Sequence, residues 1–320
     1  MRSSSAPINE SLSDSASRGW TRRFPALERL FLRCARTECP HAGRFWISAS
    51  RGRSGKYLGN RWYCSPECLE RAVQSSLSRM LAEARPAKPR THRLPLGLLL
   101  VSRRLISEEQ LKQALRLQRE GGRGRLGEWL QQIAALSGEE LTTALGLQWG
   151  CPVFPLADHA GYLRWGSLLP YPLLESSRMV PVHYDADSRL LHLAFAERLD
   201  HIALYAVEQM LGCRTTPCVA DESAVAGALD ELSRTRRSEE ACFESMTDPE
   251  EISRTTCSYA SVLGAARITL ARSSAHIWVR FFRDGVTRDL LFQISGSRPA
   301  PRSKVSIQEL KRNEKEPIKR

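Results

Sequence analysis

Four cysteines near the N-terminus have the spacing of a metal site. The pair Cys34-x4-Cys39 is followed, after 24 residues, by the pair Cys64-x3-Cys68. Two close cysteine pairs separated by a loop can place four thiolates tetrahedrally around Zn²⁺, and in a chain without an apolar signal segment zinc is favoured over disulfides. Four sulfur ligands leave no position for a substrate water, so we expect structural zinc. His41 is either a substitute ligand or an exposed loop histidine.

The residues around these cysteines leave a second interpretation open. Ser65-Pro66-Glu67 suits the first turn of a helix, and the segment around it resembles treble-clef or ribbon-like zinc fingers. Basic and aromatic side chains could form a nucleic-acid interface, or the aromatics could supply the module's small core while the arginines face water. The side chains concerned are Arg33, Arg36, Arg44, Phe45, Trp46, Arg51, Arg53, Lys56, Tyr57, Arg61 and Trp62.

An internal repeat of 30 residues follows. Pro95–Gln118 aligns with Arg125–Gln148, with ten identities in 24 positions. Each copy predicts two helices, the first beginning at Leu-Gly and the second at a capping box, Ser107-x-x-Gln110 or Ser137-x-x-Glu140. Leucines recur at helical spacing and should face inward. We therefore expect a tandem helical hairpin.

The entrance and the end of each copy suggest ligand chemistry. A helical hairpin does not by itself explain the Arg125-Leu126-Gly127 entrance or the glutamine that ends each copy. Glycine at a helix entrance allows a phosphate to approach free N–H groups, and arginine can pair with that phosphate or lie against a purine. Two copies of one half-site suit a ligand that is itself two-fold symmetric.

The tandem motif resembles a known family. LPLGLLLVSRRLISEEQLKQALRLQ and RLGEWLQQIAALSGEELTTALGLQ are similar to the N-terminal domain of type II secretion and type IV pilus assembly ATPases, of the MshEN kind. The resemblance implies cyclic di-GMP as a ligand. It also implies a set of binding residues, namely Arg125, Leu126, Gly127 and Gln148 in the second copy and Leu96, Gly97 and Gln118 in the first.

The first copy departs from the family pattern. Pro95 stands where the family has arginine, and the six-residue spacer Arg119–Gly124 is longer than usual. Arg93 lies two positions too early to be the missing arginine, but it remains a candidate phosphate contact. The resemblance is therefore compatible with retained cyclic di-GMP binding or with a structural or protein-docking descendant of the domain.

The resemblance continues beyond the repeat. Met179–His183 and Leu190–Phe195 predict strands and His201–Leu211 a helix, similar to the second half of the secretion-ATPase N-terminal domain. A helix at about 251–265 and a hairpin turning at Asp284-Gly285 resemble the domain that precedes the motor core of these ATPases.

Catalytic motifs are missing from the sequence. The only Gly-Lys, Gly55-Lys56, is followed by Tyr57 and lacks the first glycine of a phosphate-binding loop, so we expect no ATPase activity and a chain without the motor. Three histidines, His183, His192 and His201, lack metal spacing, and Gly-x-Ser-x-Gly is absent. The pair Cys213-x4-Cys218 has no accompanying second pair and predicts free thiols.

Composition and charge limit the classes of protein to which the chain can belong. The hydrophobic fraction of 42% and mean hydropathy of -0.34 indicate a globular protein, and without a membrane span or signal segment we expect it in the cytoplasm. The net charge of +12 belongs to the ends: residues 1–92 carry a surplus of +10 and residues 297–320 one of +5, leaving -3 between them. Such ends either contact an acidic partner or are solubilising segments.

Together these observations predict an α+β protein of several units. Its predicted divisions are 1–25 disordered, 26–80 zinc module, 81–94 linker, 95–150 tandem repeat, 151–233 αβ subdomain, 234–252 linker, 253–295 helix-plus-hairpin unit and 296–320 disordered basic tail. We expect a non-enzymatic regulator or adaptor that binds cyclic di-GMP or a partner protein, linked to type II secretion or type IV pilus components. The alternative is a zinc-finger protein associated with nucleic acid that uses the repeat as a scaffold.

Overall fold

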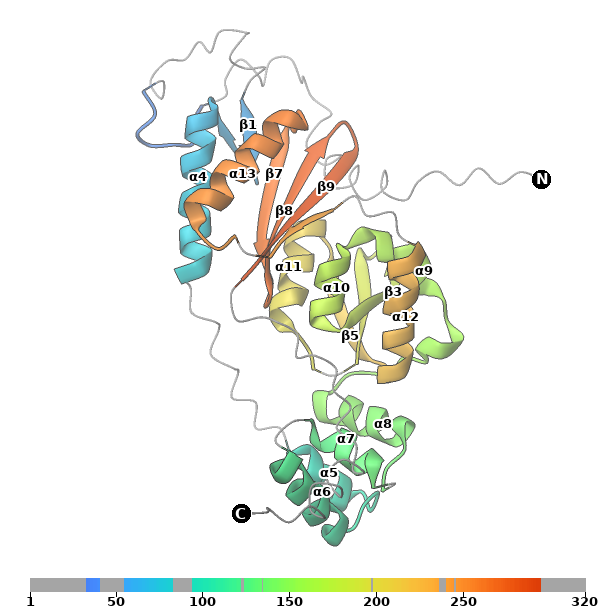
Figure 1. Cartoon of the computed structure of the whole chain (residues 1–320). Helices are drawn as coiled ribbons and strands as arrows, with labels where there is room; N and C mark the ends of the chain where they lie inside the picture. Colours follow the sequence, from blue (N-terminus) through green and yellow to red (C-terminus); the bar gives the residue numbers. More distant parts are fainter. Residues whose placement is uncertain are drawn as a thin grey trace, which may run out of the picture.

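A computed structural model of the 320-residue chain shows three stacked parts (Figure 1). One is a helical tandem repeat, the next an αβ subdomain with a small sheet, and the third a domain built on a larger sheet. The prediction of a mixed α and β protein is confirmed. The structure describes residues 33–40, 55–82, 94–121, 124–133, 135–196, 198–235, 240–244 and 246–294.

The tandem repeat consists of two helical hairpins. The first contains α5 (Leu96–Ser102) and α6 (Glu108–Gly121), and the second contains α7 (Leu126–Gln132) and α8 (Gly138–Trp149). Both predicted capping boxes are present, since Ser107 exchanges hydrogen bonds with Gln110 and Ser137 with Glu140. The two hairpins share one small core, formed by Leu100, Ile106, Ala114, Trp129, Leu130, Leu136 and Ala144.

The αβ subdomain follows and contains a three-stranded sheet in the order β3-β4-β5. Strands β3 and β4 are antiparallel and joined by a short turn, whereas β5 runs parallel to β4 after the crossover helix α11. The predicted strands and the predicted helix are all observed. The elements are α9 (Gly161–Trp165), α10 (Tyr171–Ser177), β3 (Met179–Asp185), β4 (Leu190–Phe195), α11 (His201–Leu211), β5 (Arg214–Val219) and α12 (Glu222–Thr235).

The third part, the six-stranded domain, combines segments from the two ends of the described chain. Its sheet has the order β2-β1-β7-β8-β9-β6, and helices α4 and α13 pack side by side on one face (Figure 1). Its elements are β1 (Lys56–Leu58), β2 (Arg61–Tyr63), α4 (Pro66–Ala82), β6 (Ala241–Phe243), α13 (Pro249–Val262), β7 (Arg267–Arg272), β8 (His276–Arg283) and β9 (Val286–Gln293).

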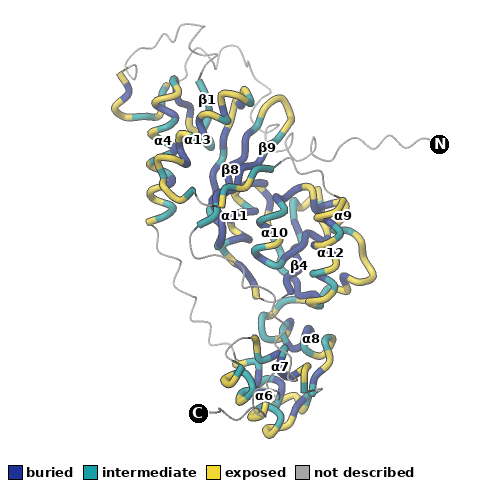
Figure 2. The backbone as a smooth tube through the Cα atoms, viewed as in Figure 1, coloured by how far each residue is buried: buried dark blue, intermediate teal, exposed yellow. Residues whose placement is uncertain are grey.

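Strand β8 is buried on both faces, as Figure 2 shows. Ile277, Val279 and Phe281 belong to the core that includes α4 and α13, whereas Trp278 between them belongs to the core of the αβ subdomain. Because alternate side chains of a strand point to opposite faces, this one strand connects two cores. The predicted hairpin is confirmed, and its turn residues Asp284 and Gly285 both have positive φ, as a type I′ turn requires.

A buried ion pair lies where the six-stranded domain meets the αβ subdomain. Arg280 donates from Nε and Nη2 to the two carboxylate oxygens of Asp289, each at 2.7 Å, and from Nη2 to the carbonyl oxygen of Leu168 at 3.0 Å. Trp278 donates its indole N–H to the same carboxylate at 2.8 Å. These hydrogen bonds compensate the charges of Arg280 and Asp289, which are both buried away from water.

The six-stranded domain differs from the division expected from the sequence. Segments 26–80 and 253–295 were expected as separate units, but their described parts share one sheet and one core. Segment 234–252, expected as a linker, contains the end of α12, strand β6 and the beginning of α13. The physical reason is size, since units of this length bury little apolar surface alone. Residues 1–25, 83–93 and 296–320 lie outside the described residues.

Candidate functional site

The four predicted zinc ligands lie together. Cys34 and Cys39 come from the loop 33–40, Cys64 follows β2, and Cys68 lies in the first turn of α4. Their four Sγ atoms all lie within 4.8 Å of one another, with Cys39 Sγ 3.5 Å from Cys64 Sγ and 3.8 Å from Cys68 Sγ. Tetrahedral zinc with Zn–S bonds of about 2.3 Å separates its sulfurs by about 3.8 Å. The four-cysteine cluster therefore has the dimensions of a zinc site.

Local structure explains how the second pair reaches the cluster. Ser65 Oγ accepts a hydrogen bond from the backbone N–H of Cys68 at 3.3 Å, and Pro66 occupies the first position of α4. This helix start turns Cys68 back toward Cys64. The helix start predicted from Ser65-Pro66-Glu67 is thus observed, and His41, the substitute ligand, lies outside the described residues.

The electrostatics of the cluster favour a cation. None of the four cysteines is in a disulfide, and three of them are buried. Burial, with the neighbouring thiols, raises the pKa of Cys64 well above its ordinary value. Burial acts in the same direction on Cys68, but hydrogen bonds from Ser65 and Arg36 lower its pKa overall. A divalent metal would stabilise all four thiolates where a lone thiolate is unfavourable.

The zinc-binding segment is attached firmly to the rest of its domain. Strand β1 pairs in parallel with β7, 210 positions later in the chain, through Tyr57 and Arg267. Lys56 donates from Nζ to the carbonyl oxygen of Ala260 (3.1 Å), in the last turn of α13, and to that of Ala265 (2.8 Å), just beyond the helix. Carbonyls of the last turn lack donors within the helix, so the bond to Ala260 caps α13. The four-cysteine cluster therefore belongs to the six-stranded domain.

The aromatic side chains near the cluster are part of its core. Trp62 is only 4% exposed, and half-buried Tyr57 packs against the same core with Arg267 lying 5.6 Å from its ring centre. Arg36 is bound to Cys68 and lies 3.8 Å from Glu38. Four of the described residues of the nucleic-acid alternative, Arg36, Lys56, Tyr57 and Trp62, thus have structural roles, whereas Arg33 and Arg61 are exposed. Arg44, Phe45, Trp46, Arg51 and Arg53 lie outside the described residues.

The motif glycines of the tandem repeat have a packing role. A Cβ on Gly97 would lie 2.6 Å from Leu111 Cδ1, and a Cβ on Gly127 would lie 2.8 Å from Leu141 Cδ2. Each glycine lets the first helix of its hairpin approach the second. The sequence alone indicates no role for these glycines in a hairpin, and the structure corrects this: a Cβ at either position would force the facing leucine to move.

The motif glutamines connect the two copies reciprocally. Gln118 of the first copy donates from Nε2 to the carbonyl oxygen of Gly124 (3.1 Å), which precedes the second motif. Gln148 of the second copy donates to the carbonyl oxygen of Leu94 (2.9 Å), which precedes the first motif. The two donors, Gln118 and Gln148, are 30 residues apart, and so are the two acceptors, Gly124 and Leu94. This distance is the length of the repeat. The two half-sites therefore have pseudo-two-fold symmetry at the level of individual hydrogen bonds.

The two entrances lie side by side but differ in charge. A Cβ on Gly97 of the first entrance would lie 3.3 Å from Leu126 Cδ2 of the second. Arg125 is the N-cap of α7, with a half-exposed side chain 3.9 Å from Glu128. Pro95 is the exposed N-cap of α5. Leu96 and Leu126 pack on the repeat core. The structure thus brings together all the predicted ligand residues except Arg93, which lies outside the described residues.

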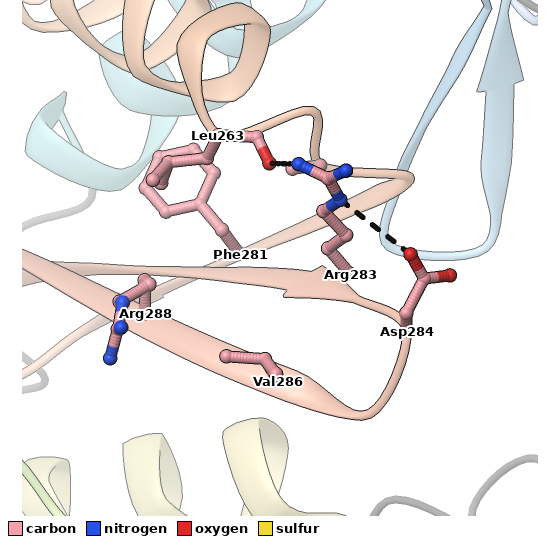
Figure 3. Close-up of a pocket in the computed structure, with 7 residues that line it drawn as sticks. Leu263, Phe281, Arg283, Asp284, Val286 and Arg288 are labelled. Carbon is pink, nitrogen blue, oxygen red and sulfur yellow. Dashed lines mark hydrogen bonds and ion pairs between the residues drawn. The ribbon is translucent and has the colours of Figure 1, made fainter.

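A hollow elsewhere on the molecule contains none of these residues (Figure 3). It lies between the end of α13 and the β8–β9 hairpin, with an apolar floor that includes Phe281 and Leu263. Arg283 at its rim donates from Nη1 to the carbonyl oxygen of Leu263 (3.0 Å), and its Nε lies 3.5 Å from Asp284. This arginine caps α13, which is a structural role.

Comparisons with known proteins agree with the tandem motif. No protein-family profile matches the chain. A type IV pilus assembly ATPase, PilB of Thermus thermophilus, is 28% identical over 134 residues. The solved structure of MshE with cdg (cyclic di-GMP) is 29% identical, with 43% of this chain and 99% of that chain covered and a TM-score of 0.38. Part of this chain is therefore similar in sequence to these two proteins.

The extent of the likeness is limited. The N-terminal domain of XpsE matches at 19% identity over 42% of this chain and 91% of that chain, with a TM-score of 0.32. The segment shared with PilB is 42% of this chain and 15% of the ATPase, so the chain spans a small part of that relative. Within the described residues, no helix combines the length and apolar character needed to cross a membrane.

Proposed function

We propose that this chain is a non-enzymatic regulator or adaptor of a type II secretion or type IV pilus-like system, acting in the cytoplasm, whose tandem repeat binds cyclic di-GMP. The observation that carries the proposal is the reciprocal pairing of Gln118 with Gly124 and Gln148 with Leu94. It arranges two equivalent half-sites about a local two-fold axis, and cyclic di-GMP has the same symmetry. The presence of cyclic di-GMP in the solved MshE structure supports this choice.

In this proposal the two half-sites together contribute three kinds of group. The entrances Leu96-Gly97 and Leu126-Gly127 present helix N-termini to the phosphates, and Arg125 neutralises one of them. Donation from Nε2 leaves the amide oxygens of Gln118 and Gln148 to accept hydrogen bonds from the guanine edge. Arg93, which lies outside the described residues, is the candidate for a second cation on the first side. Because Pro95 carries no charge, we expect weaker binding than in a site with two motif arginines.

Zinc has a structural role in the proposal. Cys34, Cys39, Cys64 and Cys68 hold one Zn²⁺ that fixes the loop 33–40 against the start of α4. The geometry supports a closed four-sulfur site, which takes no part in catalysis.

Calorimetry on the full-length, zinc-loaded chain tests ligand binding. Cyclic di-GMP should release heat with a one-to-one stoichiometry, and Arg125→Ala should weaken binding by at least ten- to a hundredfold because one charge-assisted contact is typically worth about 1.5–3 kcal/mol. Arg119→Ala, in the last turn of α6, removes an exposed arginine outside the motif and is the matched control. Equal losses in both variants would contradict the motif assignment.

The docking alternative predicts a different outcome. If the repeat is a platform for a secretion or pilus component, neither the native chain nor any entrance variant binds the nucleotide. The nucleic-acid alternative predicts a mobility shift at low salt that is lost when zinc is chelated. These outcomes separate the three hypotheses.

A further inference from the structure

Two histidines that the sequence does not connect face each other on the αβ subdomain. His183 on β3 and His192 on β4 are directly paired in the antiparallel register. Their ring centres are 5.7 Å apart and the ring planes make an angle of 52°. Their spacing along the chain is unlike that of a metal motif, and only the hairpin brings them together.

The histidine pair lies at the accessible end of one sheet face. His183 is exposed and His192 half-buried, whereas Val180 and Ala194, which are paired farther along the same two strands, are buried. The pair is therefore close to the β3–β4 turn and open to solvent. Asp185 follows His183 by two positions and so points to the same face.

The geometry of the pair suits a shared metal ion. With a metal–nitrogen bond of about 2.0–2.1 Å, an ion bound through a ring nitrogen lies about 3.2 Å from the ring centre, so two rings on one ion are separated by about 5.2 Å at a tetrahedral angle and about 6.4 Å when opposed. The observed 5.7 Å falls between these limits. No rearrangement of the strands is needed for both rings to bind one ion.

The chemistry of the pair suits the same purpose. The pKa of His192 is lowered overall, because burial and the neighbouring His183 outweigh the opposing effect of the Asp185 carboxylate. A neutral ring keeps a lone pair for a metal, and the carboxylate of Asp185 adds a favourable negative charge. That carboxylate accepts hydrogen bonds from the Ser188 hydroxyl and the Asp187 N–H, so it is held beside the pair.

We propose that His183 and His192 form a surface site for a divalent transition-metal ion of the imidazole-binding class, such as Ni²⁺, Cu²⁺ or Zn²⁺, with water completing its coordination. This site is separate from the four-cysteine cluster in position and in ligand type. It rests on the β3–β4 hairpin alone and does not depend on nucleotide binding. An ion here would bridge two strands and stabilise the hairpin.

Nickel is the probe that tests the site. Untagged, full-length chain saturated with one equivalent of zinc is dialysed against NiCl₂, and bound nickel and retained zinc are both measured. We expect one additional nickel per chain with the zinc retained. His183→Gln and His192→Gln should each abolish the additional nickel, and His201→Gln, which removes a solvent-exposed histidine at the start of α11, should leave it unchanged.

Three results would overturn the proposal. The first is that no nickel binds in addition to the zinc. The second is that nickel binds only by replacing zinc. The third is that the additional nickel still binds to both His183→Gln and His192→Gln. Circular dichroism of each variant establishes that the fold is intact. Because His183 is exposed, its substitution is tolerated by the fold and decides the question even if His192→Gln is unstable.

Discussion

The six-stranded domain and the tandem repeat position their functional residues in opposite ways. The four-cysteine cluster is buried and is held by pairing between β1 and β7, segments more than 200 positions apart. The half-sites of the repeat are partly exposed and are held by neighbouring helices through bonds between residues 6 and 54 positions apart. In the proposed function, the metal and the fold of the first region depend on each other, whereas the fold of the second region exists before its ligand binds.

Removing zinc should have the largest effect and should separate the two regions. Apparent binding energies of structural zinc are about 10–16 kcal/mol, so Cys64→Ser or chelation should unfold the loop 33–40 and β1–β2 and weaken α13, which Lys56 caps. The tandem repeat, which has its own core, should stay folded. Hydrogen exchange measures both regions in one sample.

Cys151→Ser provides the control for that experiment. This half-buried thiol lies outside the cluster, so its loss should leave zinc content and exchange rates unchanged. Purified chain without metal, or protection of β1, β2 and α13 that persists unchanged after zinc is removed, would contradict the dependence of this domain on zinc.

Acid should weaken the six-stranded domain next. Burial lowers the pKa of His276 from 6.5 to about 4, and its ring faces Ser176 across the seam with the αβ subdomain. Between pH 6.5 and 4 the unfolded chain therefore binds a proton that the folded chain does not, so stability present above pH 6.5 is lost as pH falls through this window. The pKa difference corresponds to roughly 3 kcal/mol.

Urea denaturation at pH 7 and pH 4.5 measures this effect. His276→Gln should show a smaller loss of stability over the same interval than the native chain, because its side chain does not titrate. His159→Gln, at an exposed position, should follow the native chain. Identical pH dependence in His276→Gln and the native chain would refute the assignment.

The tandem repeat should respond to a small steric change. Gly127→Ala places a Cβ 2.8 Å from Leu141 Cδ2, and overpacking of this kind costs about 1–3 kcal/mol. Gly227→Ala is the matched control, because this glycine in α12 has nothing within 4 Å and alanine favours a helix. Thermal melts should show destabilisation for the first and none for the second. Equal melting temperatures would mean that the glycine is not a packing residue.

What the sequence predicts depends on how local the structure is. Capping boxes at Ser107 and Ser137, the helix at His201–Leu211 and the turn at Asp284-Gly285 all follow from residues within a few positions of one another. The four cysteines were also predictable because zinc ligands come in close pairs.

The remainder depends on distant contacts that no local pattern encodes. Strand β1 has only three residues, and its partner β7 was assigned to another unit. His183 and His192 face each other because of the register of β3 and β4, which shifts between Pro181 and His183. The role of Lys56 as a cap of α13 likewise requires the assembled sheet. Tertiary pairing, and not composition, decides these features.

The most direct test of nucleotide binding by the repeat restores the charge that the first half-site lacks. Pro95→Arg places an arginine at the N-cap of α5, the counterpart of Arg125 at the N-cap of α7. Calorimetry with cyclic di-GMP should show binding that is roughly ten- to a hundredfold tighter than in the native chain, the effect of one charge-assisted contact. Absence of heat at high micromolar ligand in both the native chain and Pro95→Arg would contradict the account and leave the repeat as a docking platform.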